Sequence, residues 1–133
     1  SRRPAAPARL ARPRARLDPQ QAAPHLVMNQ LPPHQVAELL AGSTPPRLID
    51  VREQDEWEYC HLAGAELFPL SRIQEWAEDL AASERPLVIY CHHGVRSARV
   101  CAQLAALGHR EAINLQGGID RWSQDVDPGI RRY

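Results

Sequence analysis

Apolar and polar positions alternate in short blocks along the chain after Met28. Three blocks are short and almost wholly apolar, which is typical of strands covered on both faces by helices: RLIDV (47–51), PLVIY (86–90) and AINL (112–115). A further brief strand is predicted within GAELFPL (64–70), after a turn at its glycine. Because Leu87, Val88 and Ile89 are consecutive, the second block is the strongest strand prediction.

The blocks between these strands show the spacing of amphipathic helices. The residues expected to point inward are Val36, Leu39 and Leu40 in 32–42, Ile73, Trp76, Ala77 and Leu80 in 71–82, and Val100, Cys101, Leu104 and Leu107 in the segment ending at 108. Ser71 is the candidate N-cap of the second helix, and Gly108 is the expected end of the third. Shorter helices are predicted at 53–59 and 117–126. This alternation predicts an α/β fold with a mostly parallel sheet.

Composition divides the chain into two parts. Residues 1–27 are rich in Arg, Pro and Ala, and the prolines oppose a long helix, so we expect a flexible extension outside the fold. Residues 28–133 are long enough for one domain with one core. The first part holds six arginines and one acid, and the second holds ten arginines and fifteen acids. The folded part is therefore acidic, and we expect no nucleic-acid partner.

The hydropathy and the cysteine content of the chain indicate where in the cell the protein is expected to be. No apolar run approaches the roughly 18 residues that a membrane span requires, so we expect no membrane partner. The three cysteines, Cys60, Cys91 and Cys101, are odd in number and lack the spacing of a secreted disulfide scaffold. We therefore expect a reducing, cytoplasmic location.

A cluster of reactive side chains follows the strongest predicted strand. In order, it comprises Cys91, His92, His93, Gly94, Val95 and Arg96, with a helix expected to begin near Arg96 or Ser97. Ligands of parallel α/β folds bind at the carboxyl ends of strands, which is where Cys91 falls. Gly94 permits a sharp bend with converging amides, and the helix N-terminus adds more amides and a positive dipole. Because these groups favour an anion, Cys91 is expected to be a thiolate nucleophile.

Two other uses of the cysteines need to be considered. Most free cysteines are small buried residues, and we adopt that interpretation for Cys60 and Cys101. A zinc site could draw on Cys60-His61 and Cys91-His92-His93. Adjacent residues seldom bind one tetrahedral ion, however, and neither Cys-x2-Cys nor His-x3-His spacing occurs. We therefore expect no metal and no other cofactor.

Three segments resemble, in the family's order, those of the rhodanese (sulfurtransferase) domain. They are LIDVREQDEWEYCHLAGAELFPL (48–70), VIYCHHGVRSARVCAQLAALG (88–108) and NLQGGIDRW (114–122). The likeness spans about residues 31–122 and is to the small single-domain bacterial type. It implies a rhodanese-like three-layer α/β/α fold around a central, mostly parallel sheet.

The resemblance also implies an activity, in which Cys91 attacks the sulfane sulfur of a donor such as thiosulfate. The resulting Cys91 persulfide passes its sulfur to a thiophilic acceptor, either cyanide or a thiol, and a sulfur-relay protein would be a further partner. The substrate-binding loop implied is His92, His93, Gly94, Val95, Arg96 and Ser97, whose amides form the cradle. Arg96 would either bind an anionic donor through paired hydrogen bonds or tie the loop to the body of the domain.

Supporting positions follow from the same resemblance. Asp50 and Arg52, from the DVR triplet, recur beside the active-site loop, where Asp50 would cap the following turn and Arg52 would pair with an acid such as Glu56. Gly117, Gly118 and Trp122 resemble residues that maintain the fold.

Loop length distinguishes between two chemistries on this fold. Related phosphatases and arsenate reductases have Cys-x5-Arg, whereas Cys91 to Arg96 is the shorter Cys-x4-Arg, which favours sulfur. The loop's two histidines are mostly neutral at pH 7, so thiosulfate could stand in for a polysulfide or a protein persulfide. The alternatives are a persulfide carrier or interaction module with slow free turnover, and a rhodanese-fold phosphatase or arsenate reductase.

Overall fold

A computed structural model describes residues 29–133. The predicted extension at 1–27 and the start of the domain at Met28 lie outside the described residues. The strands are β1 (Gln30–Leu31), β2 (Arg47–Asp50), β3 (Glu66–Leu67), β4 (Leu87–Tyr90) and β5 (Ala112–Leu115). The helices are α2 (Pro33–Leu40), α3 (Gln54–Tyr59), the 3-10 turn η2 (Leu70–Arg72), α4 (Ile73–Ala81), α5 (Val95–Ala106) and α6 (Gly118–Asp125).

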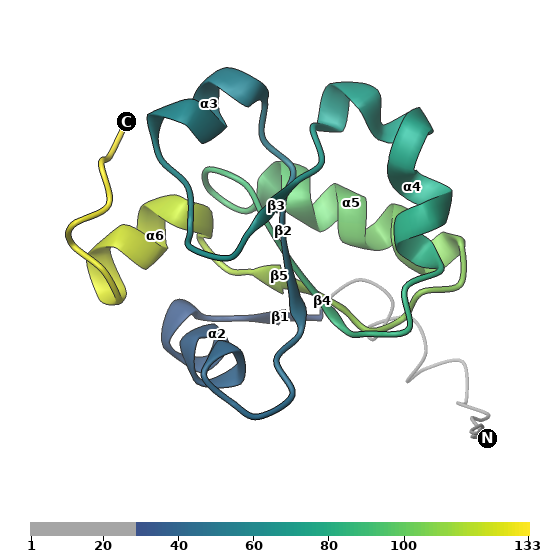
Figure 1. Ribbon diagram of the computed structural model, residues 1–133, viewed down its shortest axis with the longest axis horizontal. Helices are drawn as coiled ribbons and strands as arrows, with labels where there is room; N and C mark the ends of the chain where they lie inside the picture. The colour runs from purple at the N-terminus through teal and green to yellow at the C-terminus, as the bar shows by residue number, and fades with distance from the viewer. Residues whose placement is uncertain (1–28) are drawn as a thin grey trace.

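The five strands form one parallel sheet in the order β1-β5-β4-β2-β3 (Figure 1). Its central strand β4 is buried along its whole length, as the consecutive apolar residues predicted. Alternate residues of β4 point to opposite faces, because side chains along a strand alternate. Leu87 and Ile89 join the core under α4 and α5, and Val88 and Tyr90 join the core under α2 and α6.

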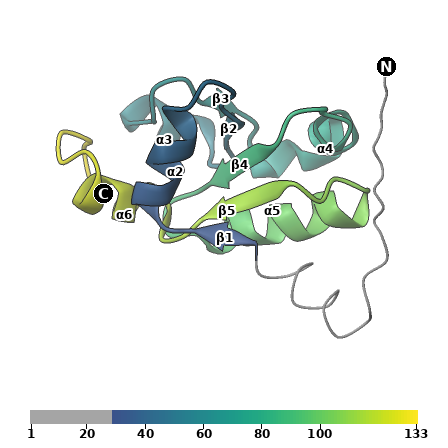
Figure 2. The same ribbon diagram turned by 90° about the horizontal axis from the view of Figure 1, so that it is seen from below.

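Helices cover both faces of the sheet, so the predicted three-layer α/β/α architecture is confirmed. Helix α5 runs along β4 and β5 on one face and packs against α4 (Figure 2). On the other face, α2 packs against α6. None of the helices within residues 29–133 is both long enough and apolar enough to cross a membrane.

Two residues predicted to point inward are exposed. Leu39 has 39% of its surface accessible, because it lies on the flank of α2, turned about 60° from the buried Val36. Leu107 is 49% exposed, because α5 ends at Ala106 and Leu107 lies beyond the edge of the layer. The predicted end of this helix is confirmed. Gly108 has φ 105°, and the next amide, His109 N, donates to Leu104 O across the turn.

The predicted N-cap of α4 is wrong. Ser71 lies inside η2, one residue before the N-cap position at Arg72. Its hydroxyl donates instead to Glu53 Oε1 at 2.6 Å. The 3-10 turn before the helix displaces the serine from the position at which it could reach the first helical amides.

Candidate active site

Cys91 follows β4 directly, at the carboxyl edge of the sheet, between the neighbouring strands β5 and β2. The chain then turns at Gly94, whose φ is 101°, and enters α5 at Val95. The helix therefore begins one or two residues earlier than predicted. The positive φ favours glycine at this position, and a β-carbon there would also make a tight contact, 3.2 Å from Gly117 N.

The sulfur of Cys91 lies within hydrogen-bond distance of three donors of the loop. The amides of Gly94 and Ser97 donate at 3.1 and 3.4 Å, and the Ser97 hydroxyl lies at 3.3 Å. Cys91 is only 1% exposed, and its other side faces the core under α4 and α5. Of the expected cradle of amides from His92 to Ser97, these two reach the sulfur.

Asn114, which sequence reasoning did not select, fixes the position of Ser97. Its Oδ1 lies 2.5 Å from the Ser97 hydroxyl, and its Nδ2 donates to Gly94 O at 3.1 Å and to Gln30 Oε1 at 3.2 Å. Ser97 has one hydroxyl hydrogen, so Cys91 Sγ and Asn114 Oδ1 compete for it. The signal in the sequence was a polar residue within the apolar strand AINL, because a buried amide requires hydrogen-bonding partners.

The N-terminus of α6 supports the loop from behind. Ile119 N donates to Cys91 O at 2.9 Å, and Asp120 N donates to His92 O at 3.1 Å. Gly118, at φ 64°, lies so close that a β-carbon would collide with both of these carbonyl groups. Gly118 therefore positions the loop, a role more specific than the fold-maintaining one predicted.

Of the two histidines that follow Cys91, His92 is partly buried and His93 is exposed. The ring of His92 stacks on Tyr133, with centroids 3.8 Å apart and planes 8° apart, and His93 lies 3.9 Å from its centroid. Burial, followed by the proximity of His93, lowers the pKa of His92. Its Nε2 is buried and has no hydrogen-bond partner among the described residues. Tyr133 is a second residue of the site that sequence reasoning missed.

Arg96 ties the loop to the body of the domain, which was one of its two predicted roles. Its Nη1 and Nη2 donate to Glu56 Oε1 and Oε2 of α3 at 2.8 and 3.0 Å. These hydrogen bonds lower the pKa of Glu56 to about 2. Two of the five N–H donors of Arg96 are therefore engaged by Glu56, and its guanidinium charge still lies close enough to Cys91 for the two to attract.

The predicted pairing of Arg52 with Glu56 is wrong, because Arg52 pairs with Asp50. Both side chains are fully buried, and Arg52 Nη2 lies 2.7 Å from Asp50 Oδ2. Asp50 also caps the turn as predicted, since its Oδ1 accepts from Arg52 N at 2.9 Å. Burial opposes the charge on Arg52, but the hydrogen bonds that it donates to Asp50 and Tyr133, together with the attraction of those groups, outweigh it and raise the pKa of Arg52. Glu56 is already engaged by Arg96, which explains the different pairing.

The other two cysteines have the surroundings of structural residues. Both are free thiols, each packed at the edge of one of the two cores. Burial raises the pKa of the Cys101 thiol to about 12, so it stays protonated. Cys60 provides a backbone carbonyl that accepts a hydrogen bond from Arg52 at 2.7 Å.

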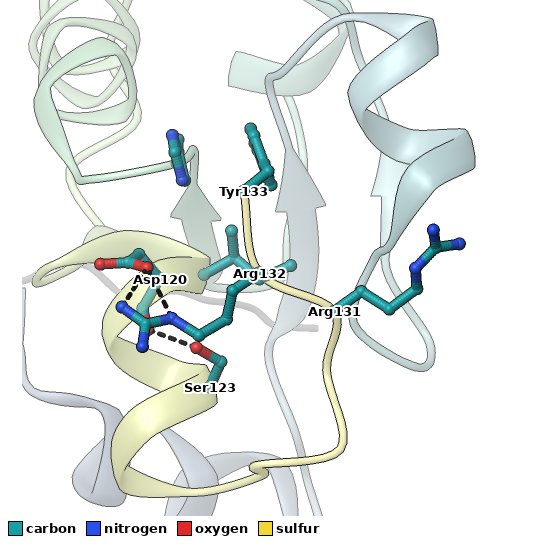
Figure 3. Close-up of a pocket in the computed structure, with 7 residues that line it drawn as sticks. Asp120, Ser123, Arg131, Arg132 and Tyr133 are labelled. Carbon is teal, nitrogen blue, oxygen red and sulfur yellow. Dashed lines mark hydrogen bonds and ion pairs between the residues drawn. The ribbon is translucent and has the colours of Figure 1, made fainter.

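One group of side chains could be considered as metal ligands. One atom each from His92, His93 and Asp120 lie within 4.8 Å of one another. Asp120 Oδ1, however, already accepts from Arg132 at 3.1 and 3.2 Å, and Figure 3 shows Arg132 lying over that carboxylate. The two imidazole rings also lie against one another, with centroids 3.9 Å apart and planes tilted by 33°, rather than on opposite sides of a common centre. This arrangement does not fit a tetrahedral ion.

A parallel sheet between two helical layers, with a cysteine held by amides at its carboxyl edge, defines a class of α/β proteins with a cysteine in the loop between a strand and a helix. Residues 32–125 match the Rhodanese-like domain family. The chain therefore belongs to the rhodanese-like domain family.

Individual relatives agree with this assignment. The chain is 38% identical over 103 residues to the probable adenylyltransferase/sulfurtransferase MoeZ of Mycobacterium tuberculosis, covering 76% of this chain but 26% of MoeZ. It is 37% identical over 75 residues to the thiosulfate sulfurtransferase GlpE of Coxiella burnetii, covering 56% of this chain and 69% of GlpE. A crystal structure of a rhodanese-like domain protein from Staphylococcus aureus is 29% identical with a TM-score of 0.66, covering 80% of this chain and 99% of that one.

Proposed function

We propose that the protein is a sulfurtransferase that carries a sulfane sulfur as a persulfide of Cys91. The observation behind this proposal is the set of donors around Cys91 Sγ, which are Gly94 N, Ser97 N and the Ser97 hydroxyl. Donors fixed in advance around an atom stabilise negative charge on it without further rearrangement during the reaction. Membership of the rhodanese-like family supports the proposal, as does the naming of the GlpE relative as a thiosulfate sulfurtransferase.

The reaction would proceed in two displacements at sulfur. In the first, the Cys91 thiolate attacks the outer sulfur of a donor such as thiosulfate, a bond forms to Sγ, and sulfite leaves with the electron pair of the broken S–S bond. In the second, a thiolate or cyanide attacks the outer sulfur of the persulfide. Cys91 then leaves as a thiolate, and the acceptor becomes a persulfide or thiocyanate. Each broken bond releases its own electron pair, so no oxidant or reductant is needed.

The charges around the loop bear on the class of donor. Three arginines near the site are each paired with a carboxylate: Arg52 with Asp50, Arg96 with Glu56, and Arg132 with Asp120. The lowered pKa of His92 keeps that ring neutral near pH 7. These three arginines therefore offer a small dianion little uncompensated positive charge, while a fourth, Arg131, lies over the Tyr59 ring, 4.0 Å from its centroid. We propose that thiosulfate is a surrogate and that the physiological donor is a polysulfide or a protein persulfide.

The same site offers less support to a phosphatase or arsenate reductase. A tetrahedral oxyanion requires donors on several oxygens, and an arginine offers two parallel hydrogen bonds for that purpose. Arg96 already uses one such pair, from Nη1 and Nη2, on Glu56. A phosphatase reading would be rescued by turnover of an aryl phosphate that Cys91→Ser abolishes.

The decisive experiment is intact mass spectrometry after incubation with thiosulfate or an inorganic polysulfide. We expect the native chain to gain the mass of one sulfur atom and Cys91→Ala to gain none. Cys60→Ala and Cys101→Ala are matched controls that should load as the native chain does. Loading of the Cys91→Ala variant would overturn the assignment.

A cyanide and thiosulfate assay then distinguishes an enzyme from a carrier. Vigorous release of thiocyanate identifies an enzyme with free turnover. Slow release combined with a stable persulfide on Cys91 identifies a module that hands sulfur between proteins. The MoeZ relative is named as both an adenylyltransferase and a sulfurtransferase. A relative that pairs sulfur transfer with a second activity supports a sulfur-relay protein as the partner of this chain. We also propose a cytoplasmic location, which the three free thiols support.

A further inference from the structure

We propose that Tyr133 is a positioning residue for the Cys91 loop, holding His92 through its ring and Arg96 through Glu56. This inference rests on the proposed function and extends it to a residue 42 positions away from Cys91 in the chain. In Figure 1 the segment after α6 turns back toward α3, and in Figure 3 Tyr133 lies at its end, above Arg132 and Asp120. Tyr133 thereby connects this segment to the active-site loop.

The hydroxyl of Tyr133 joins two ion pairs. It accepts a hydrogen bond from Arg52 Nη1 at 2.8 Å and donates one to Glu56 Oε2 at 2.8 Å. Arg52 belongs to the buried pair with Asp50, and Glu56 belongs to the pair that ties Arg96 to α3. One hydroxyl group therefore connects the rigid end of β2 to the clamp on the loop.

The hydrogen bond from the Tyr133 hydroxyl fills the last free acceptor position of the Glu56 carboxylate. Its Oε1 accepts from Glu53 N and Arg96 Nη1, and its Oε2 accepts from Arg96 Nη2 and the Tyr133 hydroxyl. A carboxylate has about four acceptor positions, and all of them are engaged. Burial, as the largest cause, raises the pKa of Tyr133 to about 12, so the hydroxyl remains a donor at neutral pH.

The ring of Tyr133 acts on the loop from a second direction. It stacks on His92, the residue next to Cys91, with the planes 8° apart. His92 is otherwise held by its backbone carbonyl, which accepts from Asp120 N, while its buried Nε2 has no partner among residues 29–133. The orientation of the imidazole therefore depends on the ring and the backbone of Tyr133 and on the ring of His93. Loss of the tyrosine would release both His92 and the clamp on Arg96.

The test measures the rate of persulfide formation on Cys91 per folded molecule, with an inorganic polysulfide as the donor. Tyr133→Phe keeps the ring but removes both hydrogen bonds, and Tyr133→Leu removes the stack as well. We expect Tyr133→Phe to lower the saturated rate about tenfold with little change in the half-saturating donor concentration, because the loop is misplaced rather than blocked. Tyr133→Leu should lower the rate further.

Tyr59→Phe is the matched control. Tyr59 contacts the same segment through a hydroxyl bond to Arg132 O and an edge-on ring contact with Tyr133, but it bonds neither Arg52 nor Glu56 within the described structure. Its rate should stay within about twofold of the native rate. An equal loss of loading rate in Tyr133→Phe and Tyr59→Phe would indicate a general role of the segment and would contradict the proposal.

A double-mutant cycle separates positioning from simple stabilisation. If Tyr133 acts through Glu56, the effect of Tyr133→Phe on the rate should nearly vanish in a Glu56→Gln background, because coupled residues are not additive. Additive effects on the rate, or rates that follow the melting temperature alone, would refute the inference. The proton signals of the His92 ring should move when Tyr133 becomes Leu, and unchanged signals would equally count against it.

The failure of this inference differs from failure of the proposed function. If the native chain forms no persulfide, the function is wrong and the rates cannot be measured. If the native chain loads sulfur and the Tyr133 variants load it equally fast, the function stands and the role of Tyr133 is rejected.

Discussion

Gly118 packs against the carbonyl oxygen of His92 so closely that no β-carbon fits between them. The contact places the first turn of α6 directly behind the active-site loop, where its amides bind the carbonyls of Cys91 and His92. The loop is therefore held by backbone groups on both sides, from α5 in front and from α6 behind.

Gly118→Ala should destabilise the fold by about 2–4 kcal/mol, because the substitution adds a backbone collision to the strain of a positive φ. Gly64→Ala is the matched control, since Gly64 has φ 80° but open space around its β-carbon position. It should cost about 1 kcal/mol, from the backbone angle alone. Urea unfolding measures both values. Equal losses in the free energy of unfolding would show that the close contact between Gly118 and the loop adds nothing to the cost of the substitution.

Ser97→Ala should slow persulfide formation by about 10- to 100-fold, because it removes the one hydroxyl that can donate to either Cys91 Sγ or Asn114 Oδ1. Mass spectrometry of samples quenched at successive times gives the rate of persulfide formation. Ser123→Ala removes a hydroxyl on α6 that donates to Asp120 O, away from the sulfur, and should load at the native rate. A native loading rate for Ser97→Ala would refute the role of the hydroxyl.

Arg52→Met should destabilise the protein by about 3–5 kcal/mol, because it leaves the buried Asp50 carboxylate without a counter-charge. The control is Arg47→Met, which breaks a partly exposed pair with Glu66 and should cost no more than about 1 kcal/mol. Thermal unfolding at neutral pH compares them. If the two variants have the same melting temperature, the buried pair contributes no more to stability than a surface pair does.

Glu56→Gln should remove part of the acid sensitivity of the fold. The pKa of Glu56 is lowered from 4.5 to about 2, mainly by hydrogen bonds from Arg96. Its stabilising contribution is therefore complete above pH 4.5 and is lost as the pH falls toward 2. The contribution is at most about 3 kcal/mol.

The check on Glu56 is the free energy of unfolding at pH 7, 5 and 3. The native chain should lose more stability between pH 5 and 3 than Glu56→Gln does. Glu58→Gln, which alters an exposed carboxylate bonded to Gln54, should follow the native curve. Parallel curves for all three proteins would contradict the role of Glu56.

The sequence allowed the sheet and the loop to be predicted because both are encoded locally. Consecutive apolar residues mark β4, and the residues that bend the chain around Cys91 lie within seven positions of one another. The exposed Leu39 and Leu107 show the limit of periodicity, which does not reveal where a covering layer ends.

Contacts between distant segments could not be predicted in the same way. Asn114 reaches Ser97 only because β5 pairs with β4, and Tyr133 reaches His92 only because the chain turns back after α6. The partner of Arg52 was mistaken for a similar reason, since the choice between Asp50 and Glu56 depends on which acid Arg96 occupies. Pairings of this kind are set by the assembled fold.

The depth of Cys91 has a consequence for how cargo is unloaded. Only 1% of the residue is accessible, whereas an added sulfur would extend about 2 Å beyond Sγ. In the loaded protein, the transferred sulfur would thus be more accessible to an incoming nucleophile than the thiol of the unloaded protein is to a bulky alkylating reagent. Large alkylating reagents should therefore discriminate between the charged and the spent forms, which gives a simple readout of occupancy.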